Sequence, residues 1–491
     1  MNALPISFFL EAPAEPFVKT RLISHKRLAE LFALPRLAFN GERKRLFSRR
    51  GRLFTHKFWD RFALNDRGPT MNAKDYDEIL KALSRRNFLR NGSAALATTI
   101  LAQAVTLRAQ ERASTQSAEH DHSSSDPGQE NKPLLDENPD SNLPPPTDHG
   151  DMVPLWYSFD LTKKRVEEGG WTHQVTQREL PSSKDLAGVN MRLTAGSYRE
   201  LHWHTADEWA YVLYGKARVT VMTPDGLIFI GDVEEGDLWL FPAGFPHSIQ
   251  GLDPDGTEFL LVFNQGSFSE DGTMLLSEWM AHTPPEVLEK NFGVGSEALA
   301  TLPTGPLYIF PGTVPANTVA EDIAEIGGST VTSPDIYTFK LKSMAPTKST
   351  KGGEVRIVDS RNFPISTHFS AALVTIKPGG MRELHWHPNA SEWQFWIAGK
   401  GRMTVFFPVD NARTVDFHAN DVGYVPSSAG HYIENTGDTD VVFLEMFAAS
   451  IFQDVSLNQW LRRLPAQMVQ AHLGFDSAAI AKIPAEKMVL L

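Results

Sequence analysis

Short runs of apolar residues, separated by glycine, aspartate and proline, recur along the C-terminal part of the chain. These runs lie at residues 217–222, 227–230, 238–241 and 259–263, and again at 372–377, 402–407, 422–425 and 441–447. Runs of this length between turn-forming residues predict β-strands. Many short strands at even spacing favour an all-β fold built from double-sheet jelly rolls.

A helical segment is expected after each group of strands. The first begins at Thr283 and Pro284, where a hydroxyl can cap the helix and proline is tolerated in the first turn. The second begins near Ser456. The pattern therefore predicts two β-barrels with short flanking helices.

Two stretches of the chain are nearly identical. The sequence RELHWH occurs at residues 199–204 and again at 382–387, and each copy is followed by a glutamate and, farther on, by a lone histidine. The offset between the copies is 183 residues at the first histidine and 184 at the last. A repeat of this length duplicates a domain-sized unit rather than a short solenoid motif.

Each copy carries three histidines and one glutamate, a suitable ligand set for a divalent transition metal. The eight candidate ligands are His202, His204, Glu208 and His247 in the first copy and His385, His387, Glu392 and His431 in the second. Residues i and i+2 of a strand share a face, and a closed barrel brings the distant histidine back to them. A single His-x-His pair is also compatible with ordinary strand histidines. Duplication of all four ligands at matched spacing argues against that interpretation.

Composition narrows the chemistry. The chain of 491 residues has no cysteine, which excludes disulfides, thiolate ligands and cysteine nucleophiles. Histidine and carboxylate ligands accept iron, cobalt, nickel, copper and zinc as well as manganese, so the ligands alone do not identify the metal. The net charge of −12 argues against nonspecific binding to nucleic acid, and we recognise no nucleic-acid-binding motif.

Residues 1–70 form a basic leader with 14 lysines and arginines against 6 aspartates and glutamates. The leader has no counterpart in the repeat, and the sequence assigns it no role. Because Met71 lies just before an export motif, the natural start is either Met1 or Met71.

Residues 71–110 resemble a twin-arginine export signal. The motif SRRNFL at 84–89 is followed by an uncharged stretch at 92–105. We therefore expect export to the periplasm or the extracellular space, with no membrane attachment after processing. Residues 111–150 are rich in serine, aspartate, asparagine and proline and predict a flexible linker.

The histidine clusters lie in patterns that resemble the two motifs of the cupin superfamily. Gly196 precedes the ligands of the first copy and Gly215 follows its glutamate, and the second copy repeats this spacing with one extra residue. Asn420 stands near the place where the second copy is expected to have a motif glycine. The resemblance implies two tandem cupin barrels, at residues 151–330 and 331–491.

The resemblance extends to one enzyme family. The segments EWAYVLYG, FPAGFPHSIQ, HYIENTGD and DVSLNQWL, together with RELHWH, are similar to bicupin oxalate decarboxylases, from about Asp148 to the C-terminus. The resemblance implies two Mn²⁺ ions per chain, oxalate as substrate, formate and carbon dioxide as products, and O₂ as a catalytic oxidant. It also implies a homohexamer, a dimer of trimers in which the helices pack between subunits.

Arg199 and Arg382 each precede the first histidine of their copy by three residues. A guanidinium beside the metal can bind a carboxylate and neutralise its charge. A surface salt bridge is the alternative for one arginine, but a matched pair favours the site. Glu445 aligns with a leucine of the first copy, and an acid in an apolar strand is costly unless it has a partner. The resemblance places Glu445 near the second metal and Arg382.

Glu270 is the candidate proton donor. It lies in GSFSEDGT at 266–273, a polar loop just after the last strand of the first barrel. The resemblance makes this loop a lid, in which Asp271 and Gly272 replace an asparagine and a serine of the family. Without the resemblance, an acid in such a loop is simply solvated. The predicted mechanism has Glu270 take a proton from oxalate and return it to carbon after carbon dioxide leaves. Only the first site has this lid, and we therefore favour it for the chemistry.

Two alternatives stay open. An oxalate oxidase would use the same four ligands, lack the lid acid, and produce hydrogen peroxide and carbon dioxide. A noncatalytic bicupin for binding or storage commonly loses metal ligands, whereas both sets are intact here.

Overall fold

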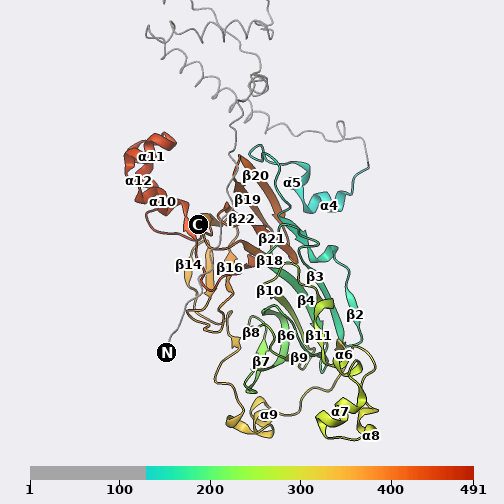
Figure 1. Cartoon of the computed structure of the whole chain (residues 1–491). Helices are drawn as coiled ribbons and strands as arrows, with labels where there is room; N and C mark the ends of the chain where they lie inside the picture. Colours follow the sequence, from blue (N-terminus) through green and yellow to red (C-terminus); the bar gives the residue numbers. More distant parts are fainter. Residues whose placement is uncertain (1–128) are drawn as a thin grey trace, which may run out of the picture. The chain divides into compact units, whose positions relative to one another are not determined.

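The computed structural model describes residues 129–491, which form two β-barrels in tandem (Figure 1). The predicted basic leader, the predicted export signal and the first part of the predicted linker lie outside the described residues. The described part of the linker contains α4 (Lys132–Glu137) and α5 (Pro139–Asn142). None of the helices within residues 129–491 combines the length and the apolar character that crossing a membrane requires. The predicted fold class, two tandem barrels with short helices, is confirmed.

The first barrel consists of facing antiparallel sheets that share one long strand, β6 (Glu208–Met222). Its other strands are β2 (Arg165–Glu167), β3 (Gly170–Val175), β4 (Ala187–Leu193), β5 (Tyr198–Trp203), β7 (Ile228–Glu234), β8 (Leu238–Phe241), β9 (His247–Gly251), β10 (Thr257–Phe263), β11 (Met274–Leu275) and β12 (Ile309–Phe310). The first half of β6 pairs with β8 and β10, and the second half pairs with β7 and β9.

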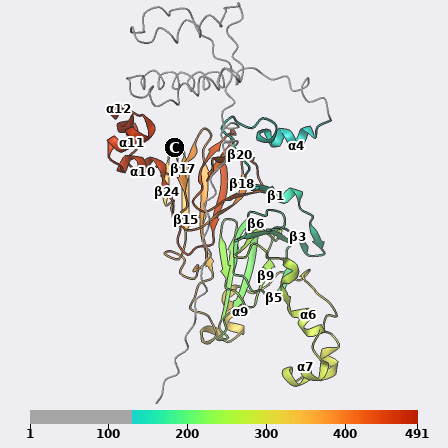
Figure 2. The same ribbon diagram turned by 45° about the horizontal axis from the view of Figure 1, so that its top comes forward.

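The second barrel repeats this arrangement, but two strands take the place of the long one, β18 (Glu392–Ala398) and β19 (Gly401–Phe407). Its other strands are β14 (Lys348–Thr350), β15 (Gly353–Val358), β16 (Ser370–Ile376), β17 (Met381–Trp386), β20 (Asn411–Phe417), β21 (Asp421–Val425), β22 (Gly430–Asn435), β23 (Val441–Phe447) and β24 (Val455–Ser456). Figure 2 shows both barrels from a second direction.

The two barrels exchange edge strands. The strand β1 (Trp156–Ser158) precedes the first barrel in the chain but pairs with β21 of the second. In return, β13 (Thr338–Phe339) follows the first barrel and pairs with its strand β8. The second barrel therefore includes a strand, β1, that precedes all strands of the first barrel in the sequence.

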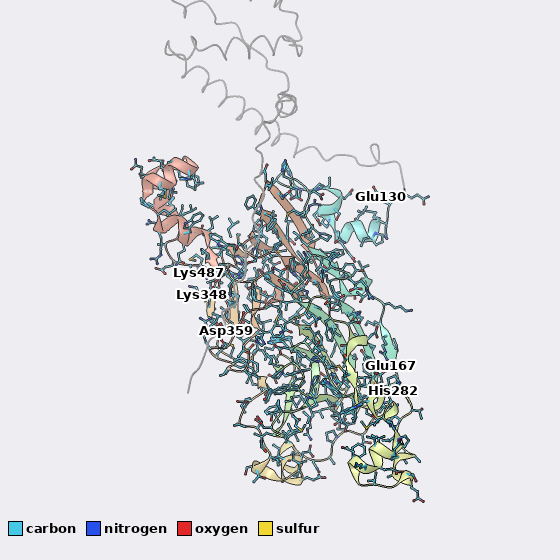
Figure 3. All side chains as sticks on the ribbon, in the orientation of Figure 1. Glu130, Glu167, His282, Lys348, Asp359 and Lys487 are labelled. Atoms are coloured by element: carbon cyan, nitrogen blue, oxygen red, sulfur yellow. The ribbon has the colours of Figure 1, made fainter. Side chains whose placement is uncertain are left out.

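The apolar strands between the barrels are buried on both faces. In β10, Phe259, Leu261 and Phe263 belong to the core of the first barrel. The alternate residues Leu260 and Val262 join a second core, to which the strands of the other barrel also contribute. Side chains fill the space within and between the barrels (Figure 3). Burial on both faces explains why these strands read as continuous apolar runs.

Short helices follow each barrel (Figure 1). They are α6 (Leu276–Ala281), α7 (Pro285–Phe292), α8 (Ser296–Leu299) and α9 (Val319–Glu325) after the first, and α10 (Leu457–Arg463), α11 (Ala466–Leu473) and α12 (Ser477–Lys482) after the second. The 3₁₀ turn η2 (Phe159–Leu161) precedes the first barrel, η3 (Glu270–Gly272) lies between β10 and β11, and η4 (Gly328–Thr330) follows α9. The helix α10 begins next to Ser456 as predicted, and the hydroxyl of Ser456 caps it by accepting from the backbone N–H of Gln459. The predicted cap at Thr283 is wrong, since its hydroxyl donates to the carbonyl of Trp279 in the preceding helix.

Asn420 adopts a left-handed backbone with φ of +70°, where Gly236 of the first barrel has +89°. Asparagine is among the few residues that enter this region readily. The turn therefore forms without the motif glycine.

Gly215 allows β6 to pass from one sheet to the other. Its φ is +75°, and a Cβ at this position would lie 2.0 Å from the carbonyl oxygen of Gly256. We expect Gly215→Ala to lower the free energy of unfolding by about 3 kcal/mol, because backbone strain and a steric clash add. Gly226→Ala is the matched control, since its φ is +80° but nothing lies within 4 Å of the added Cβ. We expect this control to lower the free energy of unfolding by about 1 kcal/mol, as measured by chemical denaturation. Equal effects of the two substitutions would contradict this account.

Candidate metal centres

Strand ends bring together the four predicted ligands of the first copy. His202 lies on β5, His204 follows that strand, Glu208 opens β6 and His247 opens β9. His202 and His247 face each other across the pairing of β5 with β9. One ligand atom from each of the four residues lies within 4.8 Å of the others, and all four residues are buried.

Hydrogen bonds orient these ligands toward a common point. The Nδ1 atoms of His202, His204 and His247 each donate to a backbone carbonyl, at 2.5, 2.7 and 2.7 Å. The Nε2 atoms are therefore the free ligand atoms. The Oε1 atom of Glu208 accepts from the indole of Trp239 at 2.9 Å, which leaves Oε2 facing the histidines.

The electrostatics of this cluster fit a divalent cation. Burial lowers the pKa of His202 and of His247, which keeps their imidazoles neutral. Burial by itself would raise the pKa of Glu208, but contacts with His204 and His247 lower it below its ordinary value. Within the described part of the chain, Nε2 of His247 has no hydrogen-bond partner. A buried carboxylate with three neutral imidazoles is the set that a divalent metal requires.

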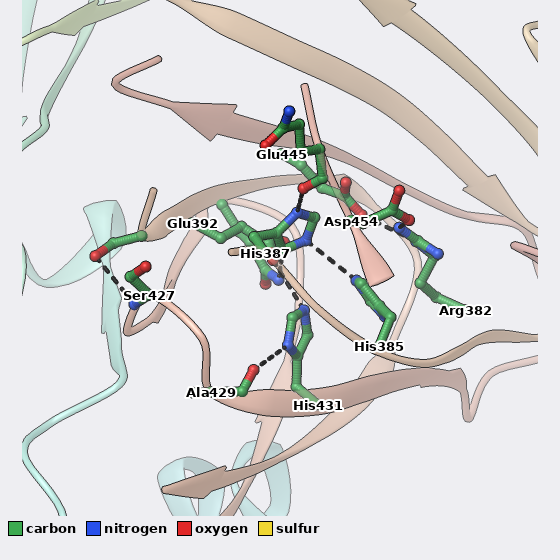
Figure 4. Close-up of polar contacts among 12 residues, drawn as sticks. Arg382, His385, His387, Glu392, Ser427, Ala429, His431, Glu445 and Asp454 are labelled. Carbon is green, nitrogen blue, oxygen red and sulfur yellow. Dashed lines mark hydrogen bonds and ion pairs between the residues drawn. The ribbon is translucent and has the colours of Figure 1, made fainter. Parts of the chain in front are cut away.

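The second copy forms an equivalent cluster (Figure 4). The Nδ1 atoms of His385, His387 and His431 donate to backbone carbonyls at 2.6, 2.8 and 3.0 Å. The Nε2 atoms of His387 and His431 lie 3.1 and 2.9 Å from Oε2 of Glu392. Neither Oε2 of Glu392 nor Nε2 of His431 has a hydrogen-bond partner among residues 129–491. The structure thus brings together both predicted ligand sets.

A register shift places the two predicted arginines inside the barrels. Residues three apart in a regular strand face opposite sides. The pairing of β5 with β9 shifts between Arg199 and His202, and that of β17 with β22 shifts between Arg382 and His385. Such an irregularity re-aims a side chain, and all four residues are buried.

Glu270 and Arg199 meet beside the first cluster. Glu270 lies in the 3₁₀ turn η3 and is 9% exposed. Its Oε2 atom is 3.4 Å from Nη2 of Arg199 and accepts a hydrogen bond from the hydroxyl of Tyr308. The guanidinium of Arg199 also lies 4.2 Å from the centre of the Tyr308 ring. The loop predicted as a lid therefore places its acid against the arginine.

Tyr308 is the functional residue that the sequence did not predict. It precedes β12, which returns to pair with β5 after three helices. Burial and the negative charge of Glu270 both raise the pKa of Tyr308, so its hydroxyl stays protonated and donates. In the second barrel, Val489 occupies the position that corresponds to Tyr308. Leu490 forms a β-bridge with Arg382 just as Ile309 pairs with Arg199, and Val489 and Tyr308 are the residues directly before them. This second repeat is too short and too divergent to be recognised in the sequence.

The second cluster differs in the partners of its arginine (Figure 4). Nε of Arg382 lies 3.4 Å from Glu445, and its Nη2 lies 2.7 Å from Asp454, which also contacts Lys487. Burial and the charge of Glu392 raise the pKa of Glu445 to about 7, although Arg382 lowers it. Arg382 is therefore flanked by two carboxyl groups. One of them belongs to Glu445, which lies near Arg382 as the sequence predicted. Asp454 was not predicted.

Comparisons with known proteins agree with this geometry. The profile of the Cupin family matches residues 159–299 and 339–481. The chain is 53% identical over 337 residues to oxalate decarboxylase OxdC of Bacillus subtilis (strain 168), which covers 69% of this chain and 86% of that protein. It is 37% identical over 387 residues to an oxalate decarboxylase of Arthroderma benhamiae, with 73% and 89% covered.

Solved structures are similar over the same part of the chain. The structure of oxalate decarboxylase from Bacillus subtilis at pH 4.6 aligns with a TM-score of 0.72 and 50% identity, covering 74% of this chain and 94% of the other. Another structure, from work on the Mn(II) centers of that enzyme, aligns with a TM-score of 0.72 and 49% identity, covering 74% and 95%.

Proposed function

The chain belongs to the cupin family, and we propose that it is an oxalate decarboxylase that holds manganese and converts oxalate to formate and carbon dioxide. The observation that carries this proposal is the buried contact of Glu270 with Arg199 and Tyr308, directly beside a complete ligand set. The pairing supplies a carboxylate-binding group and a proton carrier at one centre.

Two manganese ions per chain fit the two ligand sets. When bound at His202, His204, Glu208 and His247, manganese would supply the one-electron chemistry that weakens the carbon–carbon bond of oxalate, with O₂ as a catalytic oxidant that the net reaction does not consume. Each ligand set supplies three imidazoles and one carboxylate in a buried pocket.

Arg199 is suited to bind the substrate. Its guanidinium is buried, and its neighbour Glu270 is a single carboxylate at 3.4 Å. A guanidinium can bind a carboxylate with two parallel hydrogen bonds, which orients the substrate and offsets its charge. We infer that one carboxylate of oxalate binds there.

Glu270 is suited to move the proton. Conversion of hydrogen oxalate to formate and carbon dioxide transfers one proton from oxygen to carbon. Glu270 accepts the proton from the substrate and returns it to the carbon that has lost carbon dioxide. The hydroxyl of Tyr308 holds the carboxylate in place between the two transfers.

We assign the chemistry to the first centre. Arg382 of the second centre is flanked by Glu445 and Asp454, and Val489 stands where the first centre has Tyr308. An arginine already flanked by two carboxyl groups is a poor partner for a third. We infer that the second ion mainly stabilises the fold and assists electron transfer.

Product analysis tests the proposed function. Manganese-loaded protein given oxalate under air is expected to produce formate and carbon dioxide in equal amounts, with little peroxide. Formate is the product that the lid acid makes possible, so this outcome separates the decarboxylase from the alternative oxalate oxidase. Peroxide without formate would establish the oxidase, and absence of any transition metal would favour a noncatalytic bicupin.

Tyr308→Phe is expected to reduce turnover about tenfold, the effect of removing one hydrogen bond to a charged group. The phenyl ring keeps the packing against Arg199, so the KM for oxalate stays close to that of the unsubstituted protein. Steady-state formate assays give both values. A change in KM alone would argue that Tyr308 acts on binding rather than on the proton carrier.

We also propose a homohexamer, a dimer of trimers. Trp279 on α6 and Trp460 on α10 are 59% and 50% exposed, and each packs edge to face against a tryptophan of its own barrel. Exposed indoles on equivalent helices suit burial in a subunit interface. Sedimentation analysis should give the mass of six chains, and a monomer would exclude this assembly.

We propose that the protein is exported through the signal at residues 71–110. Replacement of Arg85 and Arg86 by lysine is expected to retain the protein in the cytoplasm, which fractionation of cells would detect. Unchanged export of this variant would contradict the proposal.

A further inference from the structure

A cavity of about 270 Å³ lies against the outer side of the first centre. Glu270 and Tyr308 form part of its wall, together with residues of β2 and β3 and the lid residue Asp271. The metal ligands of the first centre are at most 3% exposed, so oxalate cannot reach them without a movement of residues around the centre. Because Glu270 contacts Arg199 on its other side, this cavity adjoins the centre at the residue that moves the proton.

Arg165 connects the cavity to the lid and to the site. It lies on β2, an edge strand whose last residue, Glu167, is labelled in Figure 3. Its guanidinium carbon stacks 3.5 Å from the centre of the Tyr308 ring. Its Nη1 atom lies 4.0 Å from the carboxylate of Asp271, while Nε contacts Glu167 at 2.6 Å. One face of this guanidinium therefore covers the tyrosine that holds Glu270.

The carboxylates of the cavity wall differ in the number and length of their hydrogen bonds and ion pairs. Glu179 accepts from the backbone and hydroxyl of Thr176, both at 2.9 Å, and from Arg178 at 2.6 Å. Glu270 is buried between Arg199 and Tyr308. Asp271, in contrast, is 88% exposed and makes a contact of only 4.0 Å with Arg165. Ion pairs of this kind contribute little and exchange readily. Asp271 is thus the carboxylate of this wall that an incoming anion can displace.

We propose that the cavity is an entrance subsite for small dicarboxylate anions, in which Arg165 binds oxalate before the lid opens and Asp271 competes with it in the closed lid. The subsite rests on the proposed function, because oxalate is its ligand. One carboxylate of oxalate matches the two parallel N–H groups of a guanidinium, and the cavity volume accommodates an anion of this size. Displacement of Asp271 removes a contact that ties η3 to β2, next to the acid that must move aside.

The test uses steady-state formation of formate by the manganese-loaded full chain at several concentrations of potassium chloride. Arg165→Gln is expected to lower kcat/KM for oxalate about tenfold, to leave kcat within about twofold, and to weaken the salt dependence of kcat/KM. Asp271→Asn is expected to raise kcat/KM about twofold, because the competing charge is gone. Arg178→Gln is the control: it removes an arginine of the same cavity that is more exposed (77% against 41%) and whose ion pair is with Glu179 rather than with Asp271, and kcat/KM should change less than twofold.

The outcomes separate the subsite from the function. Formate production by the unsubstituted chain, with kcat/KM and its salt dependence unaffected by Arg165→Gln, would overturn the subsite and leave the decarboxylase standing. A fall in kcat alone would also overturn it, since Arg165 would then act only by supporting Tyr308. If Arg165→Gln fails to fold, the Asp271→Asn variant tests the proposal. A kcat/KM that does not rise in this variant would show that Asp271 does not compete with oxalate for Arg165, and would overturn the subsite. Absence of formate from the unsubstituted chain would overturn the proposed function itself.

Discussion

Glu270→Gln is expected to reduce the rate of formate formation about 10³-fold, within the range that general acid–base catalysis contributes. The amide has the size of the carboxylate and can still contact Arg199 and Tyr308, so the turn η3 should keep its conformation. An amide cannot accept the substrate proton and return it to carbon. The loss should therefore appear in kcat, measured from formate released under air.

Two measurements accompany this variant. Its manganese content should equal that of the unsubstituted chain, because Glu270 is not a member of the ligand set. Asp271→Asn removes the neighbouring carboxylate of the same turn, and its kcat should stay within about twofold, since an exposed charge contributes little. If Glu270→Gln kept more than a tenth of the normal kcat, the proton carrier would have to be another group.

The sequence predicted the fold because apolar pattern and repeat agree. The runs at 259–263 and 441–447 lie within strands β10 and β23, and the run at 217–222 is the second half of β6. The sequence could not predict the exchange of β1 and β13 between barrels, because strands of three and two residues carry no pattern of their own. Their pairing is determined by the packing of one barrel on the other.

The metal ligands could be predicted because each set lies at strand ends with a fixed local spacing, which the repeat doubles. Tyr308 and Asp454 could not, for different reasons. Tyr308 reaches the first centre through a two-residue pairing of β12 with β5, far from the ligands in sequence. Asp454 aligns with no acid of the first copy, because the loop before β11 is longer than the loop before β24. Long-range packing, rather than local pattern, decides which side chains complete each centre.

The two centres share their ligands but differ in the surroundings of the arginine. Arg199 faces one carboxylate, that of Glu270, which belongs to a turn at the wall of a cavity. Arg382 faces Glu445 on a buried strand and Asp454, and the second of these is itself paired with Lys487. The first arginine thus has one carboxylate neighbour, which lies on a turn, whereas the second has two. The proposed division between catalysis at the first centre and support at the second rests on these differences around equivalent ligand sets.

Glu208→Gln is expected to remove one of the two manganese ions of each chain and to reduce formate formation at least about 10³-fold, the rate equivalent of about 4 kcal/mol. Glu208 supplies the carboxylate of the first ligand set, so its loss leaves a divalent ion with three imidazole ligands and no anionic one. The amide oxygen can keep accepting from the indole of Trp239, which places the amide nitrogen where Oε2 faced the histidines. Metal analysis and formate assays on the same preparation measure both effects.

Glu392→Gln is the matched variant of the second set, because Glu392 occupies the same position relative to its three histidines. It should also lose one ion per chain, but formate formation should fall no more than about tenfold, since the groups that bind and protonate the substrate remain intact. The comparison depends on each substitution removing the ion of its own ligand set, so that Glu392→Gln keeps one ion per chain, bound at the unsubstituted first set. If Glu392→Gln kept that ion and nevertheless lost formate formation as completely as Glu208→Gln, the second centre would take part in the chemistry, and the division of labour argued from Arg382 and its two carboxylates would be wrong.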